Sequence, residues 1–359
     1  MRTTARWYRD LGSFVALLAV LGAVGCGNDF PSVSEVKTLR VLGVQKDKPY
    51  PAVGDDVQLS MLWHDGSEAA PRDIQRLWIG GCLNPPGDLF YECRDQLAAA
   101  LNATLGELDG DAIELPDPGA LPAGSLVGVG DTFHITVPPD AVRTAVPGVP
   151  DYGVMYVWYA LCAGTLGPAR VEGPFPLACF DENDNELDVT DFVVGYTTLY
   201  VFDEIRNENP RVLGLTVEGT RVPPDCIDAD CVGLDVPDAD DLDCDHVPCI
   251  PACTKKHDCP EYEIEPLVDR DSLEFDPVGS IAGGTRNEQF WSSYYVNAGS
   301  LDREGALLHD PVAGWQDQIS TKLTAPREPG VLEFWGVIHD NRGGTSWLRQ
   351  SILVTEGDE

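Results

Sequence analysis

Hydrophobic and polar residues alternate along several short segments of the chain. In residues 57–63 and 133–137 every second side chain is large and apolar, which is typical of a strand with one buried face. Residues 290–296 and 331–338 are rich in the aromatic and β-branched residues that strands favour. The turn sequence Asp-Asn-Arg-Gly-Gly at residues 340–344 then precedes another apolar segment and predicts a hairpin. These patterns predict a protein built from strands.

The composition supports this prediction. The chain has 36 glycines, 28 prolines and only 3 methionines among 359 residues. Such a content of turn formers is typical of all-β proteins with many short connections. One segment, residues 94–108, is expected to be a short surface helix because its leucines at positions 97, 101, 105 and 108 repeat every three or four residues.

Several short sequences occur twice and in the same order. Arg-Val-Leu-Gly at residues 40–43 recurs at residues 211–214. Collinear matches indicate duplication of one domain with different insertions in each copy. We therefore predict one domain over residues 38–205 and a second over residues 206–359, joined with little slack by the segment 202–210. The further matched pairs are Leu77-Trp78 with Phe290-Trp291, Thr136-Val137-Pro138 with Thr324-Ala325-Pro326, and Val157-Trp158 with Phe334-Trp335.

These two halves resemble tandem immunoglobulin-like or polycystic-kidney-disease-like β-sandwiches. The resemblance implies two antiparallel sheets packed face to face in each domain, with tryptophans such as Trp158 and Trp335 in the core. The cysteine pair that usually bridges the two sheets is not evident, and both copies carry long inserts. The expected fold is all-β, with two tandem immunoglobulin-like β-sandwiches and a disulfide-rich acidic insert, residues 223–260, in the second.

The first 25 residues have the layout of a secretory signal peptide. Three arginines precede an apolar run that is too short to span a membrane stably. Ala23-Val24-Gly25-Cys26 closes the run and resembles the lipobox of bacterial lipoproteins. The resemblance implies lipidation of Cys26, with acyl chains such as palmitate, a tether over residues 26–37 and, because Gly27 follows, sorting to the outer membrane. The alternative is ordinary cleavage near Gly25 with Cys26 left as a thiol.

Cysteine counting favours lipidation. The chain has 11 cysteines, and removing Cys26 leaves an even number that is able to form five bridges in an oxidising compartment. Local pairing of Cys82 with Cys93 and of Cys162 with Cys179 would brace loops of the first domain. Six cysteines in the insert allow fifteen pairings, so their connectivity stays open. These six are Cys226, Cys231, Cys244, Cys249, Cys253 and Cys259.

The insert is also crowded with aspartates and has few large apolar groups. Three alternatives follow: disulfides that fix a solvated loop, a calcium site, or a zinc site. The aspartate run resembles the calcium repeats of thrombospondin type 3 proteins, which implies oxygen ligands from the insert. The calcium candidates are Asp228, Asp230, Asp235, Asp238, Asp240, Asp241 and Asp243. The zinc candidates are Cys244, His246, Cys249, Cys253, His257 and Cys259.

A second calcium hypothesis comes from two short sequence motifs that resemble motifs of cadherins. Asp-Glu-Asn-Asp-Asn at residues 181–185 resembles the cadherin linker, and Leu-Asp-Arg-Glu at residues 301–304 resembles another cadherin motif. The resemblance implies ligands at Asp181, Asn183 and Asp184. The two motifs occur in the wrong order and at the wrong spacing, so an acidic turn is the alternative.

Charge and motif content limit the function. The formal net charge is −35, and about −37 without the leader, which excludes nucleic acid as a partner and disfavours anionic membrane surfaces. The six histidines are scattered and no common hydrolase or nucleotide-binding motif occurs, so we expect no enzyme.

The expected function is a non-catalytic envelope lipoprotein, anchored to the membrane by its lipid, that binds an unknown protein or glycan ligand, adheres or supports structure. The alternatives are a calcium-stiffened spacer and a carbohydrate-binding or hydrolase accessory protein. An exposed aromatic strip would favour glycans, and Trp291, Tyr294 and Tyr295 are its candidates, with core packing as the alternative.

Overall fold

A computed structural model describes residues 32–106, 113–117, 120–122, 124–145, 149–171, 173, 175–255, 258–279 and 286–357. Contacts divide the chain into two compact units, Met1–Ser32 and Val33–Glu359, and the second unit contains all the sheets described below. The predicted leader and Cys26 lie outside the described residues. Ser34 and Val36, which fall within the predicted tether, exchange backbone hydrogen bonds with Val296 of the second sandwich.

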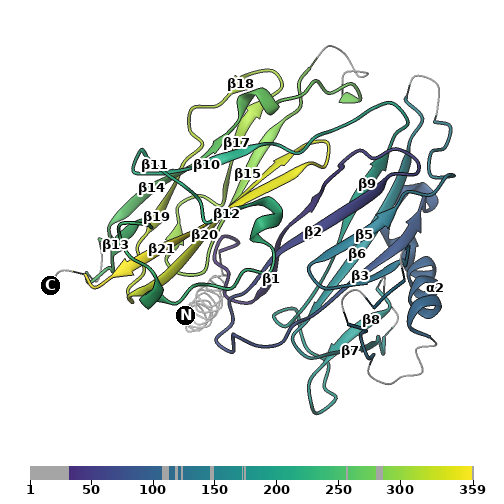
Figure 1. Ribbon diagram of the computed structural model, residues 1–359, viewed down its shortest axis with the longest axis horizontal. Coiled ribbons are helices and arrows are strands. Elements are labelled where there is room, and N and C mark those ends of the chain that lie inside the picture. The colour runs from purple at the N-terminus through teal and green to yellow at the C-terminus, as the bar shows by residue number, and fades with distance from the viewer. Residues whose placement is uncertain are drawn as a thin grey trace, which may run out of the picture. The chain divides into compact units, whose positions relative to one another are not determined.

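The first sandwich consists of a three-stranded and a four-stranded antiparallel sheet (Figure 1). Alternate residues of both sheets, including Leu59, Trp78 and Val157, form the buried layer between them. The three-stranded sheet has the order β1 (Leu39–Lys46), β2 (Asp56–Asp65) and β5 (Thr132–Thr136), and the four-stranded sheet has the order β4 (Val127–Val129), β3 (Gln75–Leu83), β6 (Gly153–Cys162) and β9 (Phe192–Val201).

The second sandwich has a five-stranded and a seven-stranded sheet, with Phe290, Phe334 and Leu348 in the layer between them. The five-stranded sheet has the order β11 (Thr220–Val222), β10 (Val212–Val217), β14 (Glu261–Val268), β19 (Thr321–Thr324) and β16 (Ser300–Leu301). The seven-stranded sheet has the order β12 (Cys226–Ile227), β21 (Thr345–Thr355), β20 (Gly330–Asp340), β15 (Phe290–Val296), β17 (Gly305–Asp310) and β18 (Gly314–Trp315), and β13 (Cys249–Pro251) pairs in parallel with β21.

The two sandwiches share one topology, and the predicted fold class is confirmed. The order β1-β2-β5 repeats as β10-β14-β19, and the order β4-β3-β6-β9 repeats as β17-β15-β20-β21. The repeated Arg-Val-Leu-Gly sequence carries the same irregularity in both copies, because the register of β1 shifts between Val41 and Gly43 and that of β10 between Val212 and Gly214.

One matched pair of the sequence is out of phase. Trp158 pairs with Ile79 in the first sandwich, whereas Trp335 pairs with Tyr295 in the second. Trp78 therefore corresponds to Tyr294, three residues beyond Trp291, the position that the match of Leu77-Trp78 with Phe290-Trp291 predicts. Short apolar dipeptides recur along any strand, so they do not fix a register by themselves.

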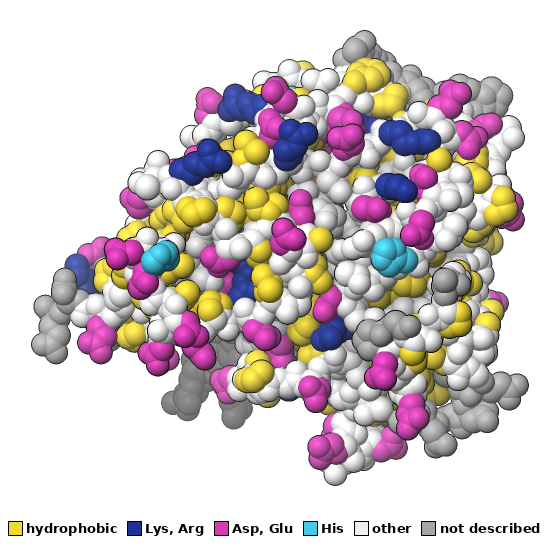
Figure 2. Space-filling model, viewed as in Figure 1, with side chains coloured by type: hydrophobic (Ala, Val, Ile, Leu, Met, Phe, Trp, Pro, Cys, Tyr) yellow, Lys and Arg dark blue, Asp and Glu magenta, His cyan; other side chains and the backbone are white. Residues whose placement is uncertain are grey.

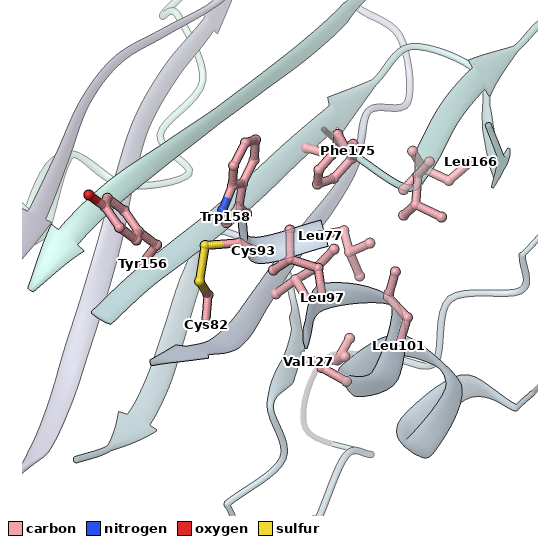
Figure 3. Close-up of a cluster of buried hydrophobic side chains, with 14 of the residues drawn as sticks. Leu77, Cys82, Cys93, Leu97, Leu101, Val127, Tyr156, Trp158, Leu166 and Phe175 are labelled. Atoms are coloured by element: carbon pink, nitrogen blue, oxygen red, sulfur yellow. A yellow bond between two sulfur atoms is a disulfide. The ribbon is translucent and has the colours of Figure 1, made fainter. Parts of the chain in front are cut away.

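A third layer covers part of the outer face of the four-stranded sheet in the first sandwich (Figure 3). The helix α2 (Arg94–Leu105) buries Leu97 and Leu101 against this face, as the leucine spacing predicts. The hairpin of β7 (Thr165–Pro168) and β8 (Leu177–Phe180) buries Leu166 and Leu177 in the same cluster. Short 3₁₀ helices complete the connections: η1 (Pro86–Asp88), η2 (Phe90–Cys93), η3 (Asp228–Cys231), η4 (Ala239–Asp241) and η5 (Arg270–Ser272).

Neither of the two tryptophans expected between the sheets lies there. Trp158 is buried in the outer layer under Phe175, because its neighbour Val157 takes the inner face. Trp335 likewise points outward, because Phe334 takes the inner face of the second sandwich. Successive strand residues face opposite sides, so one member of each pair must point outward and needs another layer to bury it.

All ten cysteines beyond Cys26 form disulfides, and each bridge joins two cysteines that follow one another in the order of cysteines along the chain. Cys82–Cys93 ties η2 to β3 beside Trp158 (Figure 3), and Cys162–Cys179 ties β6 to β8. Both pairings agree with the prediction. The insert has the three remaining bridges, which are Cys226–Cys231, Cys244–Cys249 and Cys253–Cys259.

The bridges make a direct mass prediction. A Cys26→Ala protein purified from the envelope, denatured without reductant and treated with iodoacetamide, is expected to gain no label because its ten cysteines are paired. After reduction it should gain ten labels by mass spectrometry. Label before reduction would contradict the pairing.

Candidate functional site

The two sandwiches bury a shared apolar cluster. It combines Leu42 of β1 and Leu62 of β2 with Trp335 of β20 and Trp347 of β21. Trp347 is fully buried, and its indole N–H donates to the backbone oxygen of Asp228 at 2.7 Å. The outer faces of the two sheets thus pack on each other, and the insert closes one side of the contact (Figure 1).

A buried ion network borders this contact. Arg342, in the turn between β20 and β21, is 3% exposed. Its guanidinium donates to Glu274 Oε2 at 3.0 Å, to Glu288 Oε2 at 3.2 Å and to the backbone oxygen of Arg206, and it lies 5.2 Å from the ring of Tyr50 in the first sandwich. Burial raises the pKa of Glu288 to about 8. The arginine therefore joins the turn, the connecting segment and the first sandwich.

The connecting segment adds amide bonds to the same turn. Asn207 donates to Asp340 Oδ2 at 2.9 Å, and Asn209 bridges the sandwiches by donating to the backbone oxygen of Lys46 and accepting from the N–H of Thr345. Burial lowers the pKa of Lys46 to about 8, although Asp340 opposes the shift. A segment that is bonded on both sides leaves little freedom between the two sandwiches.

Arg342→Ala is expected to lower the free energy of unfolding by about 3 to 5 kcal/mol, because it removes the hydrogen bonds that the buried guanidinium donates to Glu288 and to the Arg206 backbone oxygen and leaves both oxygens without a donor. The matched control is Arg211→Ala, which removes an ion pair between the largely exposed Arg211 and Asp269 and should cost less than about 1 kcal/mol. Urea titration measures both. Equal costs would show that the buried network does not stabilise the contact.

A cleft of about 910 Å³ opens beside the apolar cluster. One wall is β2, the following loop and the start of β3, with Trp63, Arg72 and Arg76. The other wall is the segment of the insert around Leu234 and Val236. Leu234 and Val236 are 52% and 37% exposed. Apolar side chains this exposed beside a cleft of this size are typical of a ligand-binding surface.

The cleft has an aromatic part. The imidazole ring of His64 lies 4.8 Å from the ring of Trp335, and both line the cleft. Burial, together with the nearby Arg349, lowers the pKa of His64 to about 4. This histidine is therefore neutral at pH 7 and presents an aromatic ring to the cleft.

Fixed ion pairs hold the sandwich wall of the cleft. Asp131 Oδ1 accepts from the indole of Trp63 at 2.7 Å and pairs with Nε of Arg76 at 2.9 Å, and the Arg76 guanidinium lies 5.1 Å from the Trp63 ring. Arg72 pairs with Asp65 and with Asp191, both at 2.7 Å. Rings and guanidinium groups held in this way are preorganised for binding.

The opposite wall is pinned by a buried arginine of β21. Arg349 pairs with Glu333 and donates to the backbone oxygens of Leu234 at 2.8 Å and Asp235 at 2.7 Å. Asp228 anchors the start of the same segment by accepting from the Trp347 backbone N–H at 3.0 Å. The insert is therefore a bonded wall of the cleft along residues 228–235.

A second cavity of about 420 Å³ lies between β1, β9 and the turn after β20. His339 stacks on Trp291 in its lining at 5.3 Å, and burial, together with Lys46, lowers the pKa of His339 to about 4. His64 and His339, the two histidines with lowered pKa values, thus both line cavities at the contact between the sandwiches. Neutral histidine stabilises the fold above pH 6.5, and that contribution is lost as the pH falls from 6.5 towards 4.

The double variant His64→Gln/His339→Gln tests this coupling. Between pH 7 and pH 5 the wild-type protein should lose about 4 kcal/mol more unfolding free energy than the variant, about 2 kcal/mol from each histidine, because only its unfolded state takes up protons at these two positions. Urea titrations at the two pH values measure the difference. Parallel losses in both proteins would contradict the depressed pKa values.

The structure does not bring the candidate calcium ligands of the insert together at one site. Asp228 is half-buried and bonded to Trp347, Asp243 pairs with His246, and the others lie exposed along the insert. Among the described residues no group of three His, Cys, Asp or Glu side chains is placed to hold a metal. The four zinc-candidate cysteines are in disulfides and so offer no thiolate, and His257 lies outside the described residues.

The cadherin-like residues form turns. Asp181 accepts from the backbone N–H groups of Asn183 and Asn185, both at 2.8 Å, and Asp184 pairs with Arg170. These bonds lower the pKa of Asp181, the side-chain bond from Asn185 most strongly. The segment is an exposed acidic turn of the first sandwich, whereas residues 301–304 belong to the second.

The aromatic strip is not where the sequence placed it. Tyr294 is fully buried and bonded to the Ile319 backbone oxygen, Tyr295 packs on the apolar cluster between the sandwiches, and Trp291 stacks on His339. Exposed tyrosines gather instead on the first sandwich at Tyr196 and Tyr200. Their spacing of four residues, which places both on one face of a strand, was the available signal.

Comparisons with known proteins assign no family. No protein-family model matches the chain, and no curated protein matches it. One similar solved structure contains three N-terminal domains of the highly immunogenic outer capsid protein of bacteriophage RB49, at 9% identity over 89% of this chain and 100% of that one, with a TM-score of 0.18, which is too low to support an argument. Within the part of the chain that is described, no helix is both long and apolar enough to cross a membrane.

Proposed function

We propose that the chain is a non-catalytic lipoprotein of the bacterial cell envelope, anchored through Cys26, that binds a ligand in the cleft between its first sandwich and its cysteine-rich insert. The observation that carries this proposal is the cleft itself. It combines a volume of about 910 Å³ with aromatic and charged side chains and with walls fixed by bonds on both sides.

The disulfides support the proposed location in the cell envelope. Disulfides form and persist in exported proteins, and the structure has five of them. Cys26 is then the one cysteine of the chain left for modification by lipid. Two or more acyl chains hold a protein stably at a membrane, so no protein segment needs to span it.

The bonding of the cleft supports binding rather than catalysis. Asp131 and Asp65, two of its carboxylates, already accept from Trp63 and from arginines. His64 has its pKa lowered to about 4, which makes it a weak general base near neutral pH. Groups committed to fixed pairs hold the shape of a site, whereas a general acid or base has to exchange its proton.

The anchor has a simple test. Cys26→Ala should release the protein to the soluble fraction of the envelope and abolish labelling by radioactive palmitate, because the thiol that accepts the lipid is missing. Fractionation followed by immunoblotting measures the first effect and autoradiography the second. Labelling that persists in the variant would contradict the proposed anchor.

The cleft is tested by photocrosslinking in intact cells. A benzoylphenylalanine placed at Leu234 on the rim of the cleft should give a discrete adduct, because a bound ligand lies within reach of that side chain. The matched control is the same residue placed at Val312, which is 93% exposed on the second sandwich and does not line the cleft. No adduct at Leu234, or the same adduct at both positions, would contradict binding in the cleft.

A further inference from the structure

A surface of stacked tyrosines lies on the first sandwich, apart from the cleft. We call it the tyrosine face and define it by Tyr156 of β6, Tyr196 and Tyr200 of β9, and Phe90 and Tyr91 of η2. Tyr196 stacks on Phe90 at 4.6 Å and meets Tyr156 at 5.4 Å. Tyr91, Tyr196 and Tyr200 are 49%, 39% and 39% exposed. Three exposed aromatic rings thus extend a packed aromatic cluster to the protein surface.

The strand pairing explains why these rings share one face. Trp158 of β6 lies opposite Tyr196 of β9, and Tyr156 lies opposite Thr198. Tyr200 follows Tyr196 by four residues, so both project from the same side of the sheet, about 13 Å apart along the strand. The helix α2 and the β7–β8 hairpin bury other residues of this side and leave the ends of Tyr196 and Tyr200 exposed.

Polar groups border the rings. The hydroxyl of Tyr152 donates to Asp88 Oδ2 at 2.9 Å, and that of Tyr156 donates to the Asp88 backbone oxygen at 2.8 Å. Arg143 pairs with the same carboxylate. The hydroxyls of Tyr196 and Tyr200 donate no hydrogen bond to any described residue, so both are available to a ligand.

The chemistry of this surface selects its ligand. A sugar ring presents C–H groups on its face and hydroxyls on its edge, which match the face of a tyrosine ring and its hydroxyl. The Asp88 carboxylate and the Arg143 guanidinium neutralise each other. Acidic side chains are spread over the face of the molecule in Figure 2, and a chain of net charge −35 repels polyanions. The favoured ligand is therefore a sugar chain without charge.

We propose that the tyrosine face binds a neutral polysaccharide, with sugar rings stacked on Tyr196 and Tyr200 and hydroxyls bonded at Asp88 and Arg143. This site lies outside the cleft and does not depend on the proposed function of the cleft. A membrane is the less favoured occupant, because Tyr196 and Tyr200 belong to a strand of a sheet and have an ion pair nearby, whereas membrane insertion is typical of a projecting apolar loop.

Affinity gel electrophoresis of the full lipidated protein in a nonionic detergent tests the proposal. The gels contain hydroxyethyl cellulose, laminarin, galactomannan or dextran as neutral polysaccharides, and polygalacturonate as the polyanion. At least one neutral polysaccharide should retard the protein, and Tyr196→Ala/Tyr200→Ala should weaken that binding at least tenfold. Tyr196→Phe/Tyr200→Phe keeps the rings and should retain most of it, which separates stacking from misfolding.

The matched control is Phe275→Ala, which removes an aromatic side chain that is 48% exposed on the second sandwich and should leave the retardation unchanged. The proposal fails if no neutral polysaccharide retards the protein, if polygalacturonate retards it equally, or if Phe275→Ala weakens binding as much as the tyrosine variant does. It also fails if the tyrosines matter only for binding of the Cys26→Ala protein to phosphatidylcholine vesicles. A Leu234 crosslink that persists in the tyrosine variants would show that the cleft acts independently.

Discussion

The burial of Trp335 and Trp347 between the two sandwiches is the constraint on which the other features depend. A sheet of a sandwich often keeps one face in water, whereas β20 and β21 are buried on both faces over most of their length. The first sandwich covers their outer face with Leu42 and Leu62. Because this contact fixes β2 next to the insert, it creates the cleft, and because it fixes β1 next to the turn after β20, it creates the second cavity.

Periodicity in the sequence predicted the strands and the duplication, but it did not predict which segments cover the outer faces of the sheets. Alternation shows which residues share a side, and it correctly separated the two faces of residues 57–63 and 133–137. It does not show what covers the second side, so Trp158 and Trp335 were expected between the sheets of their own sandwiches. The unbroken apolar stretch around Phe334 was a hint, since a strand without alternation is buried on both sides.

The candidate site was less predictable, because its groups come from segments far apart in the sequence. The aspartates of the insert were candidate ligands of one calcium site. Their positions along the chain do not show which of them form hydrogen bonds to the strands instead. Asp225 accepts from the Ser351 backbone N–H, Asp228 accepts from that of Trp347, and the backbone of Asp235 accepts from Arg349. These bonds attach the insert to β21 and hold its aspartates apart from one another. The acidic segment therefore serves mainly as a structural wall of the cleft.

Rigidity explains how one small protein offers two separate binding surfaces. The Arg342 network and the Asn209 bridge fix the sandwiches to each other, so a ligand in the cleft meets walls that need no ordering. The tyrosine face lies on one sheet and is braced by Cys82–Cys93 and by the packing of α2 beneath Trp158 and its neighbours. The face nevertheless touches the contact between the sandwiches, because Tyr196 also lines the second cavity and Tyr200 packs on Tyr50, the ring beside Arg342. Loosening that contact should therefore change the cleft directly and reach the tyrosine face only through these two rings.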